Sequence, residues 1–156
     1  MPTLESAPTK SVSVPTVELT RIVRTSRARV YEAWTNPEDL KTWFGPDNMH
    51  CSTVELDPQP GGAYIIAVRR NDADPSEPDA AASGNYTKVV PDQLLQFTWK
   101  PTWNPSEESL VTVSFKDVAD GTQINIRHEN CEADACERYA NGWNGCLDKM
   151  QVVLAD

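Results

Sequence analysis

The stretch of residues 132–154, at the C-terminal end, constrains the fold more than any other part of the chain. Its apolar residues recur at helical spacing, and they are Cys136, Tyr139, Ala140, Trp143, Cys146, Leu147, Met150, Val153 and Leu154. Such spacing predicts one long helix, about 30 Å in length, that buries a single stripe. Gly142 and Gly145 lie on either side of Trp143, where the lack of a side chain lets a backbone or a ligand come close. The rest of the chain must supply the surface that covers this stripe.

A first strand, over residues 17–24, and two short helices are predicted ahead of the main run of strands. Ser26 can cap the first helix, and Asn36 with the proline after it is a compact start for the second. The apolar sides of the two helices carry Val30, Ala33 and Trp34, then Leu40, Trp43 and Phe44. A Gly-Pro pair at 45–46 ends the second helix.

From Met49 onward the apolar residues alternate with polar ones, which is typical of strands. The alternating stretches cover residues 49–56, 63–70, 84–90, 95–99, 111–115 and 124–128. Turn residues join them, so we expect antiparallel pairing. The predicted fold class is α+β: a curved antiparallel sheet of about seven strands around the C-terminal helix, with two short helices between strands 1 and 2. Residues 1–15 are predicted to be a flexible tail, and residues 16–156 a single domain.

Charge and composition exclude several classes of function. The chain of 156 residues carries a net charge of −9, whereas binding to nucleic acids or anionic membranes needs a positive face. No apolar run is long enough to span a membrane, and residues 1–15 lack the apolar core of a secretory signal. Four cysteines do not make a disulfide scaffold in a chain of this size. We therefore expect a cytoplasmic protein with reduced thiols, without nucleic-acid binding or membrane insertion.

Several short segments, in order along the chain, resemble those of one protein family. They are 33–38 (AWTNPE), 43–46 (WFGP), 57–62 (DPQPGG), 84–86 (GNY), 95–99 (LQFTW), 111–115 (VTVSF), 121–122 (GT), His128 and 142–143 (GW). Together they resemble the bacterial domains named after the activator of the heat-shock-protein ATPase. These domains belong to the SRPBCC superfamily, with START lipid-transfer domains, aromatic-polyketide cyclases and the birch-pollen-allergen type. The resemblance covers residues 17–154.

This resemblance implies a helix-grip fold, in which the sheet and the C-terminal helix enclose a hydrophobic cavity. It does not imply one chemistry, since many members have no known activity. The family name suggests a co-chaperone, but that role in the eukaryotic namesake also involves a separate N-terminal domain. We expect no room for such a domain in this chain.

A ligand cavity is predicted between the inward face of the sheet and the helix stripe. Aromatic walls with a few polar tips are typical of small-molecule sites. The candidate ligand-binding residues are Trp43, Tyr64, Ile66, Tyr86, Phe97, Trp99, Val113, Phe115, Ile126, His128, Tyr139, Trp143, Cys146, Leu147 and Met150. Residue types alone favour a plain filled core, whereas the resemblance favours a cavity.

His128 and Cys146 are the two residues whose chemistry could go beyond binding. His128 shares its parity with the isoleucines before it, so it should point inward. It could be a general acid/base or a ligand hydrogen bond, or else a buried structural histidine, because no nucleophile or carboxylate is evident beside it. Cys146 could be a nucleophile only with a lowered thiol pKa, and no cation in the neighbouring turns is evident to lower it.

Two further features of the sequence concern a metal site and a lid. The set His128, Cys131 and Cys136, even with His50 and Cys51 added, matches no compact zinc spacing, so we predict neither metal nor cofactor. Trp103 lies in a loop between prolines and acidic residues. A large aromatic group in such a place is either a lid over the cavity mouth or the contact of a homodimer.

Three functions remain open from the sequence. The first is binding of a small hydrophobic molecule, aromatic or lipid-like, in the cavity. The second is an enzyme of the polyketide cyclase or hydrolase type, in which His128 and a tyrosine would move protons. The third is a stress-related, co-chaperone-like interaction module, which should show a filled core and an exposed apolar patch.

Overall fold

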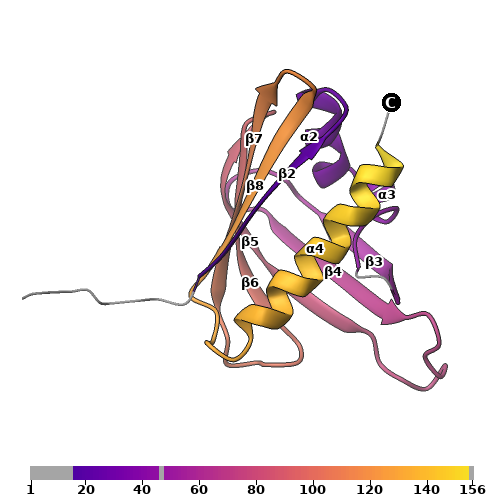
Figure 1. Cartoon of the computed structure of the whole chain (residues 1–156). Helices are drawn as coiled ribbons and strands as arrows, with labels where there is room; N and C mark the ends of the chain where they lie inside the picture. Colours follow the sequence, from indigo (N-terminus) through magenta and orange to yellow (C-terminus); the bar gives the residue numbers. More distant parts are fainter. Residues whose placement is uncertain (1–15, 46–47, 155–156) are drawn as a thin grey trace, which may run out of the picture.

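One seven-stranded antiparallel sheet, in the order β2-β8-β7-β6-β5-β4-β3, curls around a single long helix (Figure 1). The computed structural model describes residues 16–45 and 48–154, so the predicted tail over residues 1–15 lies outside the described residues. The elements are β2 (Thr16–Val23), α2 (Arg27–Thr35), α3 (Pro37–Leu40), β3 (Met49–Leu56), β4 (Ala63–Arg70), β5 (Ala80–Val90), β6 (Leu94–Pro101), β7 (Ser109–Val118), β8 (Gly121–Glu129) and α4 (Cys136–Val153). This architecture confirms the predicted fold class.

The register of the central strands places the expected side chains on the inner face. In the β7–β8 pair, Val113 lies opposite Ile126 and Val111 opposite His128. All four are fully buried, as the alternation of the sequence predicts. On β4, Val68 has the same inward parity as Tyr64 and Ile66, yet it is only half-buried. That exception marks where the sheet is left uncovered.

The two short helices cover one end of the sheet. Ser26 accepts a hydrogen bond from the Arg29 amide, and Asn36 accepts from the amides at the start of α3, so both predicted caps are confirmed. The indole Nε1 of Trp43 donates to the Ala33 carbonyl at 3.0 Å. These helices therefore close the end of the core with aromatic rings.

Several element boundaries differ from the sequence prediction, by up to four residues. Strand β5 begins at Ala80, four residues earlier than expected, because the small residues 80–83 show no alternation yet pair with β4. Helix α4 begins at Cys136, since residues 133–135 form turns. Helix α3 ends at Leu40, and a turn carries the chain on to Gly45, whose φ of 109° favours glycine.

Helix α4 lies along the concave side of the sheet (Figure 1). Arg21 on β2 ties it down by donating to Asp148 at 2.8 Å, to Gln151 at 2.8 Å and to Asn144 at 2.9 Å. Among the described residues, no helix has the length and apolar character needed to cross a membrane.

Candidate functional site

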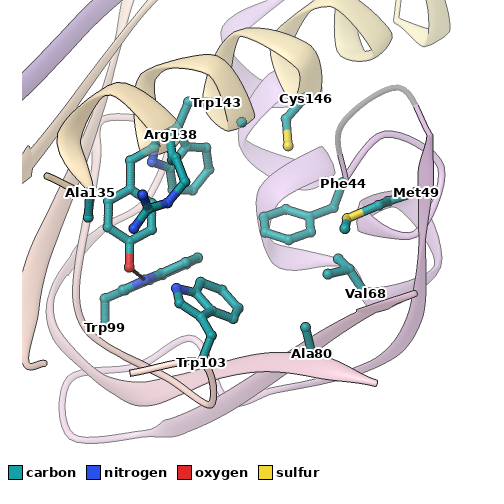
Figure 2. A pocket seen from close by; sticks show the side chains of 12 residues that line it. Phe44, Met49, Val68, Ala80, Trp99, Trp103, Ala135, Arg138, Trp143 and Cys146 are labelled. Carbon is teal, nitrogen blue, oxygen red and sulfur yellow. Dashed lines mark hydrogen bonds between the residues drawn. The ribbon is translucent and has the colours of Figure 1, made fainter. Parts of the chain in front are cut away.

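A pocket of about 510 Å³ lies between α4 and the β3–β5 part of the sheet (Figure 2). Ala135, just before α4, and the helix itself form one wall, with Arg138, Tyr139, Gly142, Trp143 and Cys146. The other walls are Phe44, Met49, Val68, Ala80, Trp99 and Trp103. A preformed concave site of this size, with mostly apolar walls, is typical for small molecules.

The structure divides the predicted site residues into three groups. Trp99, Tyr139, Trp143 and Cys146 line the pocket. Tyr64, Ile66, Tyr86 and Phe97 surround a void of only about 10 Å³ beside it. The other predicted residues are buried and line neither space, and they are Trp43, Val113, Phe115, Ile126, His128, Leu147 and Met150.

The physical reason for this division is the position of the helix. Helix α4 packs onto the β2 side of the sheet, where its stripe and the inward face fill each other. Space is left at the β3–β5 side, so only the residues that face this side reach the pocket. The sequence shows which side chains point inward. It does not show that α4 covers the β2 side of the sheet and leaves the β3–β5 side open.

Eight lining residues were absent from the predicted set: Phe44, Met49, Val68, Ala80, Trp103, Ala135, Arg138 and Gly142. Three of them carried a signal in the sequence. Val68 shares the parity of Tyr64 and Ile66, which predicts a place on the inward face. Trp103 was expected to be a lid or a dimer contact, and its position at the pocket fits the first of these. Gly142 was expected to let a group come close, and a side chain added there would meet nothing within 4 Å.

Aromatic rings form the wall on one side of the pocket. The ring centroids of Trp99 and Trp143 are 5.6 Å apart, and Trp103 lies 6.4 Å from Trp99 and 6.5 Å from Tyr139. Such spacings and tilted or edge-on geometries are the ones that aromatic pairs prefer. Trp103 remains 50% exposed, so it forms the outer rim of this wall.

A buried hydrogen-bond network holds this wall from behind. Trp99 Nε1 donates to the Tyr139 hydroxyl at 3.2 Å, and that hydroxyl donates to Glu107 Oε2 at 2.8 Å. Ser109 Oγ donates to the same Glu107 oxygen at 2.9 Å and lies 2.8 Å from His128 Nε2. Glu107 comes from the loop before β7 and is 5% exposed. Its carboxylate therefore collects hydrogen bonds from α4 and β7 at once.

Trp143 determines which tautomer His128 adopts. The indole Nε1 of Trp143 can only donate, and it lies 3.2 Å from His128 Nδ1. Nδ1 must therefore accept, which leaves the proton on Nε2, directed at Ser109. Burial lowers the pKa of His128 to about 4, so the ring is neutral at physiological pH.

This geometry corrects the expectation that no nucleophile or carboxylate lies near His128, because Ser109 and Glu107 are both there. They do not form a catalytic triad. In a triad the histidine takes the serine proton, whereas here Nε2 already carries its own proton and Nδ1 is occupied by Trp143. Ser109 is 2% exposed and does not line the pocket. The arrangement is structural.

Cys146 faces the pocket but is a poor nucleophile. Its sulfur accepts a hydrogen bond from the Gly45 amide at 3.2 Å. Burial raises the pKa of the thiol to about 12, although nearby Lys149 acts in the opposite direction. A cation is therefore present in the next turn, contrary to the expectation from sequence, but its effect is smaller than that of burial.

The candidate metal ligands do not assemble into a site. Within residues 16–45 and 48–154, no group of three or more histidine, cysteine or acidic side chains is placed to hold a metal ion. Cys131 and Cys136 lie with their sulfurs 3.4 Å apart, and His50 hydrogen-bonds Asn71 on the surface.

Comparison with known proteins places the chain in a family. Residues 24–155 match the family described as Activator of Hsp90 ATPase homolog 1-like protein. The chain belongs to this family. The match confirms the resemblance seen in the sequence and agrees with the helix-grip architecture. A search among curated proteins gave no match.

Solved structures of similar fold come from several bacteria. Protein CV1439 from Chromobacterium violaceum is 24% identical with a TM-score of 0.79, over 91% of this chain and 99% of that one. The AHSA1 (SPO3351) protein from Silicibacter pomeroyi is 19% identical with a TM-score of 0.76, over 90% and 97%. CalU16 from Micromonospora echinospora is 18% identical with a TM-score of 0.69, over 90% and 76%. At these low identities, the three structures show that this chain shares their fold, and they show nothing of its function.

Proposed function

We propose that this protein binds a small apolar molecule in the pocket between α4 and the sheet. The observation that carries the proposal is the pocket itself: about 510 Å³ lined by side chains that are almost all apolar. Pockets for small ligands run from about 300 to 1,000 Å³, and transfer of apolar surface from water into such a pocket is favourable.

The shape of the walls supports a ligand with a ring. Trp99, Trp103 and Trp143 offer flat faces along one side of the pocket. An aromatic ligand stacked on such a face gains about 0.5–1.5 kcal/mol beyond the burial of its surface. The hydrogen bonds of Trp99 and Trp143 hold these rings in place before a ligand arrives, which reduces the entropy lost on binding.

The two alternatives receive less support from the geometry. A cyclase or hydrolase needs a group that moves protons at the pocket wall, but the nitrogens of His128 are both engaged behind it. Burial and the hydrogen bond to Glu107 raise the pKa of Tyr139, which leaves its hydroxyl a weak acid. A co-chaperone-like interaction module should have a filled core, and the presence of the pocket argues against that function. The homodimer and the cytoplasmic location stay predictions.

A pocket-filling variant tests the proposal. Gly142→Leu projects a side chain into the pocket, since nothing lies within 4 Å of the added carbon. Asn141→Leu adds the same side chain to the neighbouring, exposed position of α4 and is the matched control. Native mass spectrometry of freshly purified protein checks for a co-purified small molecule, and calorimetric titration with 2-naphthamide measures affinity.

We expect the wild type and Asn141→Leu to bind, and Gly142→Leu to lose at least about tenfold in affinity by steric exclusion. The proposal fails if the wild type carries no molecule and binds no apolar probe. It also fails if Gly142→Leu binds as tightly as the control, because the probe then occupies another place.

A further inference from the structure

Arg138 is the one charged side chain among the residues that line the pocket. It belongs to the first turn of α4, and Figure 2 shows it on the side of Trp143 and Trp99, across from Phe44 and Met49. Its side chain is exposed, so the guanidinium lies where the apolar interior meets solvent. A ligand that fills the pocket ends beside this charge.

Within the described residues, Arg138 uses one of its guanidinium nitrogens in a hydrogen bond to the protein, and its other donors have no protein acceptor. Its Nη1 donates to the Asp134 carbonyl at 3.2 Å, and among the described residues no carboxylate lies within ion-pair distance of it. By contrast, Arg21, Arg29 and Arg69 each have a carboxylate oxygen within 3.1 Å. Among the described residues, Arg24 and Arg138 are the two arginines without a carboxylate oxygen within ion-pair distance, and only Arg138 lines the pocket.

The position gives Arg138 no evident role in stabilising the fold. A positive charge in the first turn of a helix opposes the helix dipole, which favours anions there. Its guanidinium has five N–H donors in a planar fork that matches the two oxygens of a carboxylate. The lining of the pocket is therefore mostly apolar, with one positive charge at one end.

We infer that the ligand is an amphiphile with a carboxylate: its apolar body fills the pocket and its acidic group pairs with Arg138. This inference rests on the proposed function and narrows its ligand class. The net charge of −9 repels anions at long range, so the attraction must come from the local guanidinium. A neutral amide or alcohol of the same shape offers one oxygen to accept from the guanidinium, but it supplies neither the second oxygen nor the negative charge.

Matched pairs of ligands test the inference. 2-Naphthoate and 2-naphthamide have almost the same shape and differ in charge, as do decanoate and decanamide. Each is titrated by calorimetry, at about pH 7.5 and low salt, into the wild type, Arg138→Gln and Arg127→Gln. Arg127 is an exposed arginine on β8 that does not line the pocket, so it controls for the loss of one positive charge.

We expect the wild type and Arg127→Gln to prefer the acid in at least one pair by about 3- to 10-fold, a range between a surface ion pair and a charge-assisted hydrogen bond. Arg138→Gln should lose this preference and keep its affinity for the amide. Equal affinity for acid and amide in the wild type, or a preference that survives Arg138→Gln, overturns the inference while the proposed function stands. If the wild type binds none of the four molecules and carries no co-purified one, the proposed function itself fails.

Discussion

His128 shows how one residue can be directed by its neighbours toward structure and away from chemistry. The Trp143 indole donates to Nδ1, and the ring packs against Tyr139 with centroids 4.4 Å apart. Protonation would place a second hydrogen on Nδ1, directed at the indole N–H, and would charge a group that is 0% exposed. The native state therefore requires the neutral ring.

This requirement makes stability depend on pH. The pKa of His128 is lowered from 6.5 to about 4 by burial, so between these values the unfolded chain binds more protons than the native protein. Stability is fully present above about pH 6.5 and falls as the pH drops toward 4, by at most about 3 kcal/mol.

Urea unfolding at about pH 7.5 and about pH 5 measures the effect, because most carboxylates stay ionised in that range. The wild type and His50→Gln, which alters the exposed histidine, should lose stability together. His128→Gln should start less stable and show a flatter dependence. A slope that His128→Gln leaves unchanged would assign the pH dependence to other groups.

At the scale of elements, Glu107 connects a loop, a strand and a helix. Its carboxylate accepts from Tyr139 on α4 and from Ser109 on β7, and Tyr139 in turn accepts from Trp99 on β6. The bonds of Tyr139 to Glu107 and to Trp99 join residues 32 and 40 positions apart in the sequence. We infer that this network, more than apolar contact alone, sets how the first turns of α4 sit against the sheet.

A double-mutant cycle checks this connection. Glu107→Leu removes the acceptor at similar size, and Tyr139→Phe removes the donor, so each leaves a buried polar partner unsatisfied and should cost about 1–3 kcal/mol of unfolding free energy. Because the two side chains share a hydrogen bond, the double mutant should cost less than the sum by about 0.5–3 kcal/mol.

Tyr64→Phe is the control partner for Glu107→Leu, since Tyr64 donates instead to the Thr98 carbonyl. That pair should be additive within about 0.5 kcal/mol. Additivity in the Glu107 and Tyr139 pair as well would mean that the hydrogen bond does not couple the loop to the helix.

At the scale of the whole molecule, most of the fold could be predicted from the sequence but little of the pocket. Alternation and helical spacing report which side of an element is apolar, and that local property determined the sheet, the helix and the inward face. The start of β5 at Ala80 was not predicted, because apolar and polar residues do not alternate over 80–83. Glu107 lies in a loop, and nothing in the neighbouring sequence indicates that two hydroxyls converge on it. Arg138 and Met49 were not predicted to line the pocket, because the lining depends on how α4 is placed over the sheet.

The extent of the folding unit is a further prediction at this scale. The sequence predicts that the domain begins near residue 16, and Thr16 is the first residue of β2, opposite Glu129 on β8. A chain that starts at Thr16 should unfold in urea within about 0.5 kcal/mol of the full chain. A chain shortened further, to start at Arg24, loses β2 and should be severely destabilised. A large loss already on starting at Thr16 would show that residues 1–15 belong to the folded unit.

Trp103 gives the molecule a natural optical reporter. Of the five tryptophans, Trp103 is 50% exposed, and the other four, Trp34, Trp43, Trp99 and Trp143, are at most 5% exposed. A quencher dissolved in the water, such as acrylamide, therefore reaches the emission of one indole and leaves the rest bright. Because that indole is also the rim of the pocket, a guest that settles there shields it. Occupancy of the pocket can thus be followed as a loss of acrylamide quenching of the intrinsic tryptophan fluorescence, with no dye attached.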